Sequence, residues 1–247
     1  MILINTTSPE LARQLKRIPA KQLPFAQSLI ANRMAQVVKS NELAVMKARF
    51  DRPTPFSLNS LKLTPGRKGK PEARVWFKDW APKGTPADKY LRPEAFGGER
   101  SQKRSERALI ARGYMTKTQY LVPASAARLD AYGNVSRGQV VQILSALRAF
   151  NQSGHNANAT NSARSMRNQA RSGANKLFFG TVDGQAGIWQ RVQSAFGAGV
   201  KPVMIATDGS PKYRVRLPFF AIAENTIAAN YERVATKAID EVLATAR

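Results

Sequence analysis

The residues whose types and spacing could do chemistry are basic, and they form two groups. In the first group, four cations follow one another at spacings that would share one face of a helix. The second lies in a stretch from 131 to 182 that contains no acid. Cations of this kind bind phosphates electrostatically, so both groups are candidate contacts to nucleic acid. The first group is Arg100, Lys103, Arg104 and Arg107, and the second is Arg164, Arg167, Arg171 and Lys176.

The charge of the whole chain supports this interpretation. The 247 residues include 39 Lys and Arg against 16 Asp and Glu, which gives a formal charge of +23 at pH 7. Such a charge destabilises a compact monomer by self-repulsion, so we expect a polyanionic partner, and no base-reading motif is recognisable. Taken alone, the first group is more typical of a solvated helix face. With the whole charge considered, nonspecific contact to DNA is the leading interpretation.

Residues typical of enzymes and metal sites are scarce. The chain has no Cys and a single His, His155, which lies in a polar segment that offers nothing to orient it. This disfavours thiolate nucleophiles, Ser–His–Asp triads and zinc sites with two imidazoles. The basic segment from Gly66 to Lys70 lacks the spacing of a phosphate-binding P-loop and is typical of a hairpin loop. We therefore predict no enzymatic activity, no cofactor and no metal.

A metal-dependent nuclease is the least favoured alternative. Its carboxylates would come from Asp79, Asp88, Glu94 and Glu99, if the fold brought them together. None of the 16 acids has a Lys two positions later, the spacing common in such enzymes.

Helices at both ends and strands between them must position these cations. Residues 1–50 predict two helices, the first capped by Ser8 and the second opened by Pro24, and residues 218–246 predict a long final helix. Alternating residues at 73–77 and short apolar runs between 176 and 206 predict strands. This order favours an α+β fold: N-terminal helices, a central antiparallel sheet with a helical insertion, and a long C-terminal helix.

The middle of the chain predicts two more helices and an arm. A charged helix fits 99–112, and a capping box from Ser136 to Gln139 opens an amphipathic helix over 137–150. Residues 151–173 are rich in Asn, Ser, Ala and Gly and bury too little apolar surface to order themselves. We expect them to be a mobile arm that becomes ordered on a partner, with its arginines on one face if it becomes helical.

The predicted organisation therefore has three parts. Residues 1–50 form the N-terminal helices, and residues 51–90 together with 176–247 form the α+β core with the C-terminal helix. Residues 91–175 are an insertion that contains the charged helix, the capped helix and the polar arm. The first ten residues lack the basic and apolar regions of a secretion signal, and no run of about 18 apolar residues occurs, so we expect a soluble protein without a membrane partner.

Five short motifs stand out: Leu23–Ala26, Phe50–Phe56, Glu72–Lys78, Gly187–Arg191 and Lys201–Ile205. Together they resemble the minor tail protein Z (tail-completion) family of lambda-like phages. The resemblance covers roughly residues 20–80 and 185–247, and relative to the family pattern the part from about 90 to 175 is an insertion. The last two motifs are similar to the family's end, where a strand with a Lys/Arg-Pro pair leads into a final helix.

The resemblance implies a structural protein of the virion near the head–tail junction, without enzymatic activity. It implies a homo-oligomeric ring around the DNA path, with other tail, neck or portal-proximal proteins as partners. The protein would reside in the tail or neck of the virion, and in the host cytoplasm during assembly. The first rival interpretation is a free, sequence-nonspecific DNA-binding protein. Neighbouring genes for portal, capsid or tail proteins would favour the virion.

Overall fold

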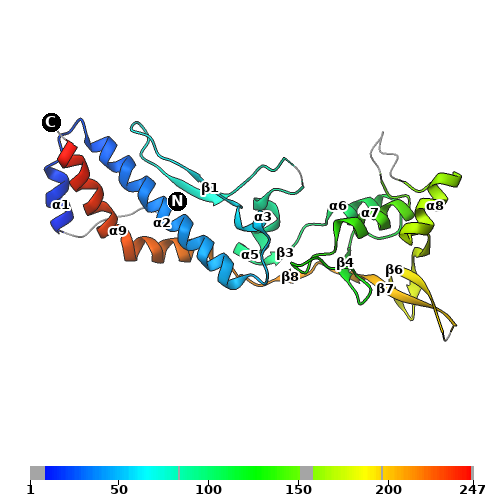
Figure 1. Cartoon of the computed structure of the whole chain (residues 1–247). Coiled ribbons are helices and arrows are strands. Elements are labelled where there is room, and N and C mark those ends of the chain that lie inside the picture. The colour runs from blue at the N-terminus through cyan, green and yellow to red at the C-terminus, as the bar shows by residue number, and fades with distance from the viewer. Residues whose placement is uncertain (1–8, 83, 151–157, 196, 246–247) are drawn as a thin grey trace. The chain divides into compact units, whose positions relative to one another are not determined.

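A computed structural model describes residues 9–82, 84–150, 158–195 and 197–245. The chain divides into two compact units (Figure 1). Unit 1 comprises Met1–Gly98 and Tyr213–Arg247, and unit 2 comprises Glu99–Lys212. The predicted division differs from this one, because it kept the N-terminal helices as a separate part and placed the strands after residue 176 with the C-terminal helix. The predicted α+β class is confirmed, with antiparallel sheets between N-terminal and C-terminal helices.

Three helices form one end of unit 1: α1 (Pro9–Lys16), α2 (Leu23–Arg49) and α9 (Phe219–Thr245). All three were predicted, although the expected cap, Ser8, lies outside the described residues. The three helices lie together (Figure 1) and bury apolar side chains between them. Helices α2 and α9 are also joined by an ion pair and by a 2.6 Å hydrogen bond from Asn41 to Thr226. The buried side chains between them include Leu11, Ile30, Met34, Val234, Ile239 and Val242.

The rest of unit 1 is a two-stranded hairpin with short helices. The predicted hairpin is confirmed as β1 (Leu61–Thr64) paired antiparallel with β2 (Arg74–Phe77). One face of the hairpin packs on α2 and α9 through a core that includes the buried Met46, Phe77 and Phe219. The short helices are α3 (Pro55–Leu58), α4 (Ala87–Tyr90) and α5 (Arg92–Phe96).

Unit 2 is built on a four-stranded antiparallel sheet with the order β4-β7-β6-β5. The sequence predicted β5, β6 and β7 but not the edge strand β4. Two further short strands, β3 (Gly98–Glu99) and β8 (Lys212–Tyr213), pair with each other where the chain passes between the units. The four strands are β4 (Gln119–Pro123), β5 (Leu177–Val182), β6 (Gln185–Ser194) and β7 (Gly197–Asp208).

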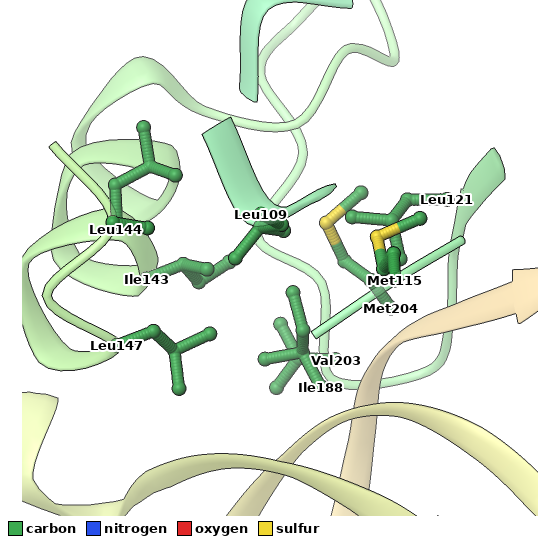
Figure 2. Close-up of a cluster of buried hydrophobic side chains, with 10 residues drawn as sticks. Leu109, Met115, Leu121, Ile143, Leu144, Leu147, Ile188, Val203 and Met204 are labelled. Carbon is green, nitrogen blue, oxygen red and sulfur yellow. The ribbon is translucent and has the colours of Figure 1, made fainter. Parts of the chain in front are cut away.

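Helices α6 (Arg104–Ala111) and α7 (Arg137–Ala146) pack on this sheet. Figure 2 shows their side chains pointing toward those of the strands: Leu109 from α6 and Ile143 from α7 meet Ile188 and Val203. All four of these side chains are at most 2% exposed. This core fixes α6 and α7 on the sheet, and with them the cations that they carry.

Three predictions for the middle of the chain need correction. The helix expected over 99–112 begins only at Arg104, and the helix expected over 137–150 ends at Ala146, before Arg148 adopts a left-handed φ of 53°. The arm expected to be mobile contains a regular helix, α8 (Ala163–Ser172). Residues 151–157 of that arm, including His155, lie outside the described residues.

Candidate nucleic-acid interface

Local signals set both ends of α8. At its start, the Ser162 hydroxyl accepts a hydrogen bond from the backbone N–H of Ser165 at 3.3 Å, which caps the helix. At its end, Gly173 adopts a left-handed φ of 71°, a conformation that glycine takes at little cost. Both signals are visible in the sequence, and they could have predicted this helix.

The residues on either side of α8, rather than burial of the helix itself, attach it to unit 2. Before the helix, the Asn158 amide exchanges two 3.0 Å hydrogen bonds with the backbone of Phe150, and Ala159 N–H donates to Ser145. After it, Ala174 is only 4% exposed. No residue of α8 itself is buried. The expectation that this segment needs an outside surface to become ordered is therefore wrong for α8, because its flanking residues supply the anchors.

The second group of predicted cations lies on and beside this helix. Arg164, Arg167 and Arg171 are exposed and lie three and four residues apart, so they share one helix face. Lys176 is also exposed, at the end of the short 3-10 helix that follows. None of the ion pairs among the described residues involves these four side chains. The structure thus leaves their charges open to an external polyanion.

The first group of predicted cations does not share a helix face. Arg100 lies before α6, and its guanidinium donates to both Glu106 carboxylate oxygens, at 2.8 and 2.6 Å. The Arg100 side chain is only 12% exposed and lies over the Tyr120 ring at 4.9 Å. Its charge is therefore used inside the protein, and the prediction that it contacts DNA loses its support.

The sequence analysis missed Glu106, the carboxylate that pairs with Arg100. It is fully buried and also accepts hydrogen bonds from the backbone N–H groups of Lys103, at 2.6 Å, and Leu121, at 2.9 Å. Burial alone would raise the pKa of Glu106, but the hydrogen bonds from Arg100 and the two N–H groups outweigh it and hold the pKa below its ordinary value. The available signal was a Glu at the third position of a helix, which is typical of a capping box.

The capping bond explains why α6 begins at Arg104. Lys103 is the residue that precedes the helix, so neither it nor Arg100 belongs to the predicted face. Desolvation, followed by the nearby Arg100 charge, lowers the pKa of Lys103. Arg104 and Arg107 are exposed on α6. Lys103 is exposed as well, so of the first group only Arg100 lacks the exposure that a contact to a polyanion requires.

The acids considered for a nuclease do not gather in the described part of the chain. No group of three or more His, Asp or Glu residues that could hold a metal occurs there. Glu94 instead lies 3.9 Å from Arg216. None of the helices of the described residues combines the length and the apolar character needed to cross a membrane.

Comparison with known proteins gives no relative. No protein-family model, no curated protein and no solved structure matches this chain.

Proposed function

We propose that this protein is a structural component of a bacteriophage virion, a minor tail or neck protein that forms a homo-oligomeric ring around the DNA path. The family resemblance motivates the virion role, and the single observation that supports DNA contact is the open cationic face of α8. The partners would be copies of the chain, DNA, and other tail, neck or portal-proximal proteins. The protein would enter the virion after assembly in the host cytoplasm. The proposal includes no catalytic step and no cofactor.

The geometry of α8 suits a phosphate backbone. Arg164 and Arg171 are seven residues apart on a helix, which corresponds to about 10 Å along its axis. A DNA strand presents one phosphate per about 3.4 Å of duplex axis, so the three guanidinium groups of α8 can each reach a different phosphate. Contacts to phosphates position a protein on DNA without selecting a sequence. This matches a protein that touches DNA of any sequence as it passes.

The far end of the β6–β7 hairpin offers a contact between copies. Toward the turn between β6 and β7, the pairing of β6 with β5 ends at Gln190, and the pairing of β7 with β4 ends at Met204. Beyond these points, residues 191–193 and 198–200 pair with each other, and no further strand of the described residues pairs with them (Figure 1). We call these two segments the β6–β7 ribbon. Strand edges with free backbone groups pair readily with a strand of another chain, and here the other chain would be a neighbouring subunit.

A salt titration of DNA binding tests the α8 contact. The variant Arg164→Ala/Arg167→Ala/Arg171→Ala is compared with a control that removes the same charge from exposed positions in unit 1, Lys16→Ala/Arg17→Ala/Lys21→Ala. Each lost phosphate contact reduces the slope of log K against log[salt] by about 0.9, so the α8 variant should lose about 2 to 3 from the slope. The control should keep the slope of the natural chain.

Two results would count against the proposal. Equal slopes for the α8 variant and its control would show that this helix does not touch the phosphates. Strong preference for one duplex among unrelated sequences would favour a sequence-specific regulator instead. The alternative hypothesis, a free nonspecific DNA-binding protein, predicts the same slopes. It predicts neither a ring nor the presence of the protein in the virion.

A further inference from the structure

The β1–β2 hairpin of unit 1 carries a second concentration of positive charge. Residues 62–74 contain five cations and a single acid, Glu72. The register pairs Lys62 with Trp76 and Thr64 with Arg74, so Lys62 and Arg74 are diagonal neighbours on one face of the hairpin. The opposite face carries Leu61 and its partner Phe77 into the core. The five cations are Lys62, Arg67, Lys68, Lys70 and Arg74.

The loop between these strands is fixed to α2 rather than left free. The Asn32 side chain accepts a hydrogen bond from the backbone N–H of Gly66 at 2.7 Å and donates one to the Gly66 carbonyl at 3.1 Å. In Figure 1 the loop beyond β1 reaches back beside α2. The two hydrogen bonds satisfy both the backbone N–H and the backbone carbonyl of Gly66. Asn32 therefore sets the place of the whole loop.

The loop is also closed internally. Arg67 and Lys70 exchange reciprocal backbone hydrogen bonds, both 2.8 Å long, around Lys68 and Gly69. Gly66 is buried, and a Cβ there would lie 2.9 Å from the backbone nitrogen of Glu72, so the close approach requires glycine. The loop tip is thus a rigid turn that presents a defined row of side chains.

The charges at this tip face solvent. Arg67, Lys68 and Lys70 are exposed, as are Lys62 and Arg74. Lys70 lies 3.4 Å from Glu72, and the other four cations take part in none of the ion pairs of the described residues. Four like charges without an ion-pair partner on one hairpin repel one another, and this adds to the destabilisation that the net charge of the chain already causes. A polyanionic partner would relieve that repulsion.

We infer that this hairpin is a second contact to the phosphate backbone of duplex DNA, separate from α8, and that Asn32 pre-organises it. The inference rests on the proposed DNA contact and adds a second site to it. A loop that is already ordered loses less conformational entropy on binding than a free one, which increases its affinity. DNA is favoured over a membrane surface because residues 67–70 contain no apolar side chain to enter a lipid interface.

Three variants of the full chain test this with fluorescent duplexes over a range of salt. Arg67→Ala/Lys68→Ala removes two contacts and should reduce the slope of log K against log[salt] by about 2. Asn32→Ala removes no charge, so it should weaken binding about three- to tenfold at every salt concentration and leave the slope unchanged. The control Lys16→Ala/Arg17→Ala, with the same loss of charge as the first variant, should keep the natural slope.

Lysine footprinting gives a readout that does not depend on a variant folding. An acetylating reagent applied to the natural chain should modify Lys68 less when duplex DNA is bound, and Lys16 equally with and without DNA. The inference is overturned if Lys68 is modified equally, or if the loop variant has the slope of its control. Protection of Lys68 by vesicles rich in phosphatidylglycerol, but not by DNA, would replace DNA with a membrane.

The outcomes separate this inference from the proposed function. If the α8 variant loses slope and the loop variant does not, only the hairpin contact fails. If neither variant loses slope, the DNA contact of the proposed function fails as well. Because the two sites share no residue, their effects on the slope should add when the variants are combined.

Discussion

Glu42 is the residue with the least usual environment in the described structure. It lies on α2, is fully buried, and neither of its carboxylate oxygens has a hydrogen-bond partner. Burial raises the pKa of Glu42 from 4.5 to about 8. The carboxyl is therefore protonated in the folded protein at neutral pH and ionised in the unfolded chain.

This difference predicts how stability depends on pH. Below pH 4.5 Glu42 is protonated in both states, so its ionisation does not affect stability. As the pH rises toward 8, folding must take up a proton, and stability falls. Glu42→Gln removes this effect, so the variant should match the natural chain near pH 4 and exceed it by a few kcal/mol near pH 8. Urea unfolding at both pH values measures it.

The exposed Glu224 on α9 provides the matched control. Glu224→Gln should leave the difference in stability between pH 4 and pH 8 unchanged. A natural chain and a Glu42→Gln variant that lose stability in parallel would contradict the assignment of this proton to Glu42.

Arg100 and Glu106 make a second prediction at the scale of residues. Arg100→Met leaves the buried Glu106 carboxylate without its bidentate partner, which should cost about 3 to 5 kcal/mol of unfolding free energy. Arg104→Met, at an exposed position four residues later, should change stability by less than about 0.5 kcal/mol. Denaturant unfolding compares the two. Equal stability of both variants would show that Arg100 is not needed inside unit 2.

At the scale of elements, the β6–β7 ribbon makes the prediction about assembly. Val200 lies on the ribbon and is 38% exposed, and a charge placed on a strand edge opposes pairing with another chain. If the proposed ring forms through this ribbon, Val200→Lys should shift the protein from the ring toward single chains in native mass spectrometry. Val141→Lys makes the same change on α7, where the side chain is 43% exposed, and should leave the ring intact. Identical assemblies for both variants would exclude the ribbon as the subunit contact.

The elements that the sequence predicted are those whose signals are local. Helices α2 and α9 carry long apolar stripes, and the β1–β2 hairpin has an alternating strand after a loop rich in Gly and Pro. Strand β4 was missed because its five residues become a strand only by pairing with β7, more than 80 residues later. The segment 151–173, which contains α8, was predicted to be mobile because its composition offers little apolar surface to bury. Anchors of α8 such as the Asn158–Phe150 hydrogen bonds lie outside the helix.

The candidate interface was predictable to a similar extent. Arg164, Arg167 and Arg171 stand in an acid-free stretch, and their helix leaves them exposed as the charge pattern suggested. Arg100 was assigned to the same kind of face because spacing alone does not show where a helix starts. In the structure, Arg100 instead donates to both carboxylate oxygens of the buried Glu106.

At the scale of the whole molecule, a charge of +23 has to be reconciled with the proposed assembly of many copies. Like charges on neighbouring subunits oppose ring formation, and DNA in the channel would offset that repulsion. Each unit carries an exposed cationic element of its own, α8 in unit 2 and the β1–β2 hairpin in unit 1. The charge is thus spread over exposed elements of both units.

Quantitative mass spectrometry of purified, DNA-filled particles made by the genome that encodes this chain tests the central claim most directly. The virion role predicts a fixed, small number of copies per particle, retained through density-gradient purification and high salt, with antibody label at the head–tail junction. A protein that is abundant in the lysate but missing from the filled particles would contradict it.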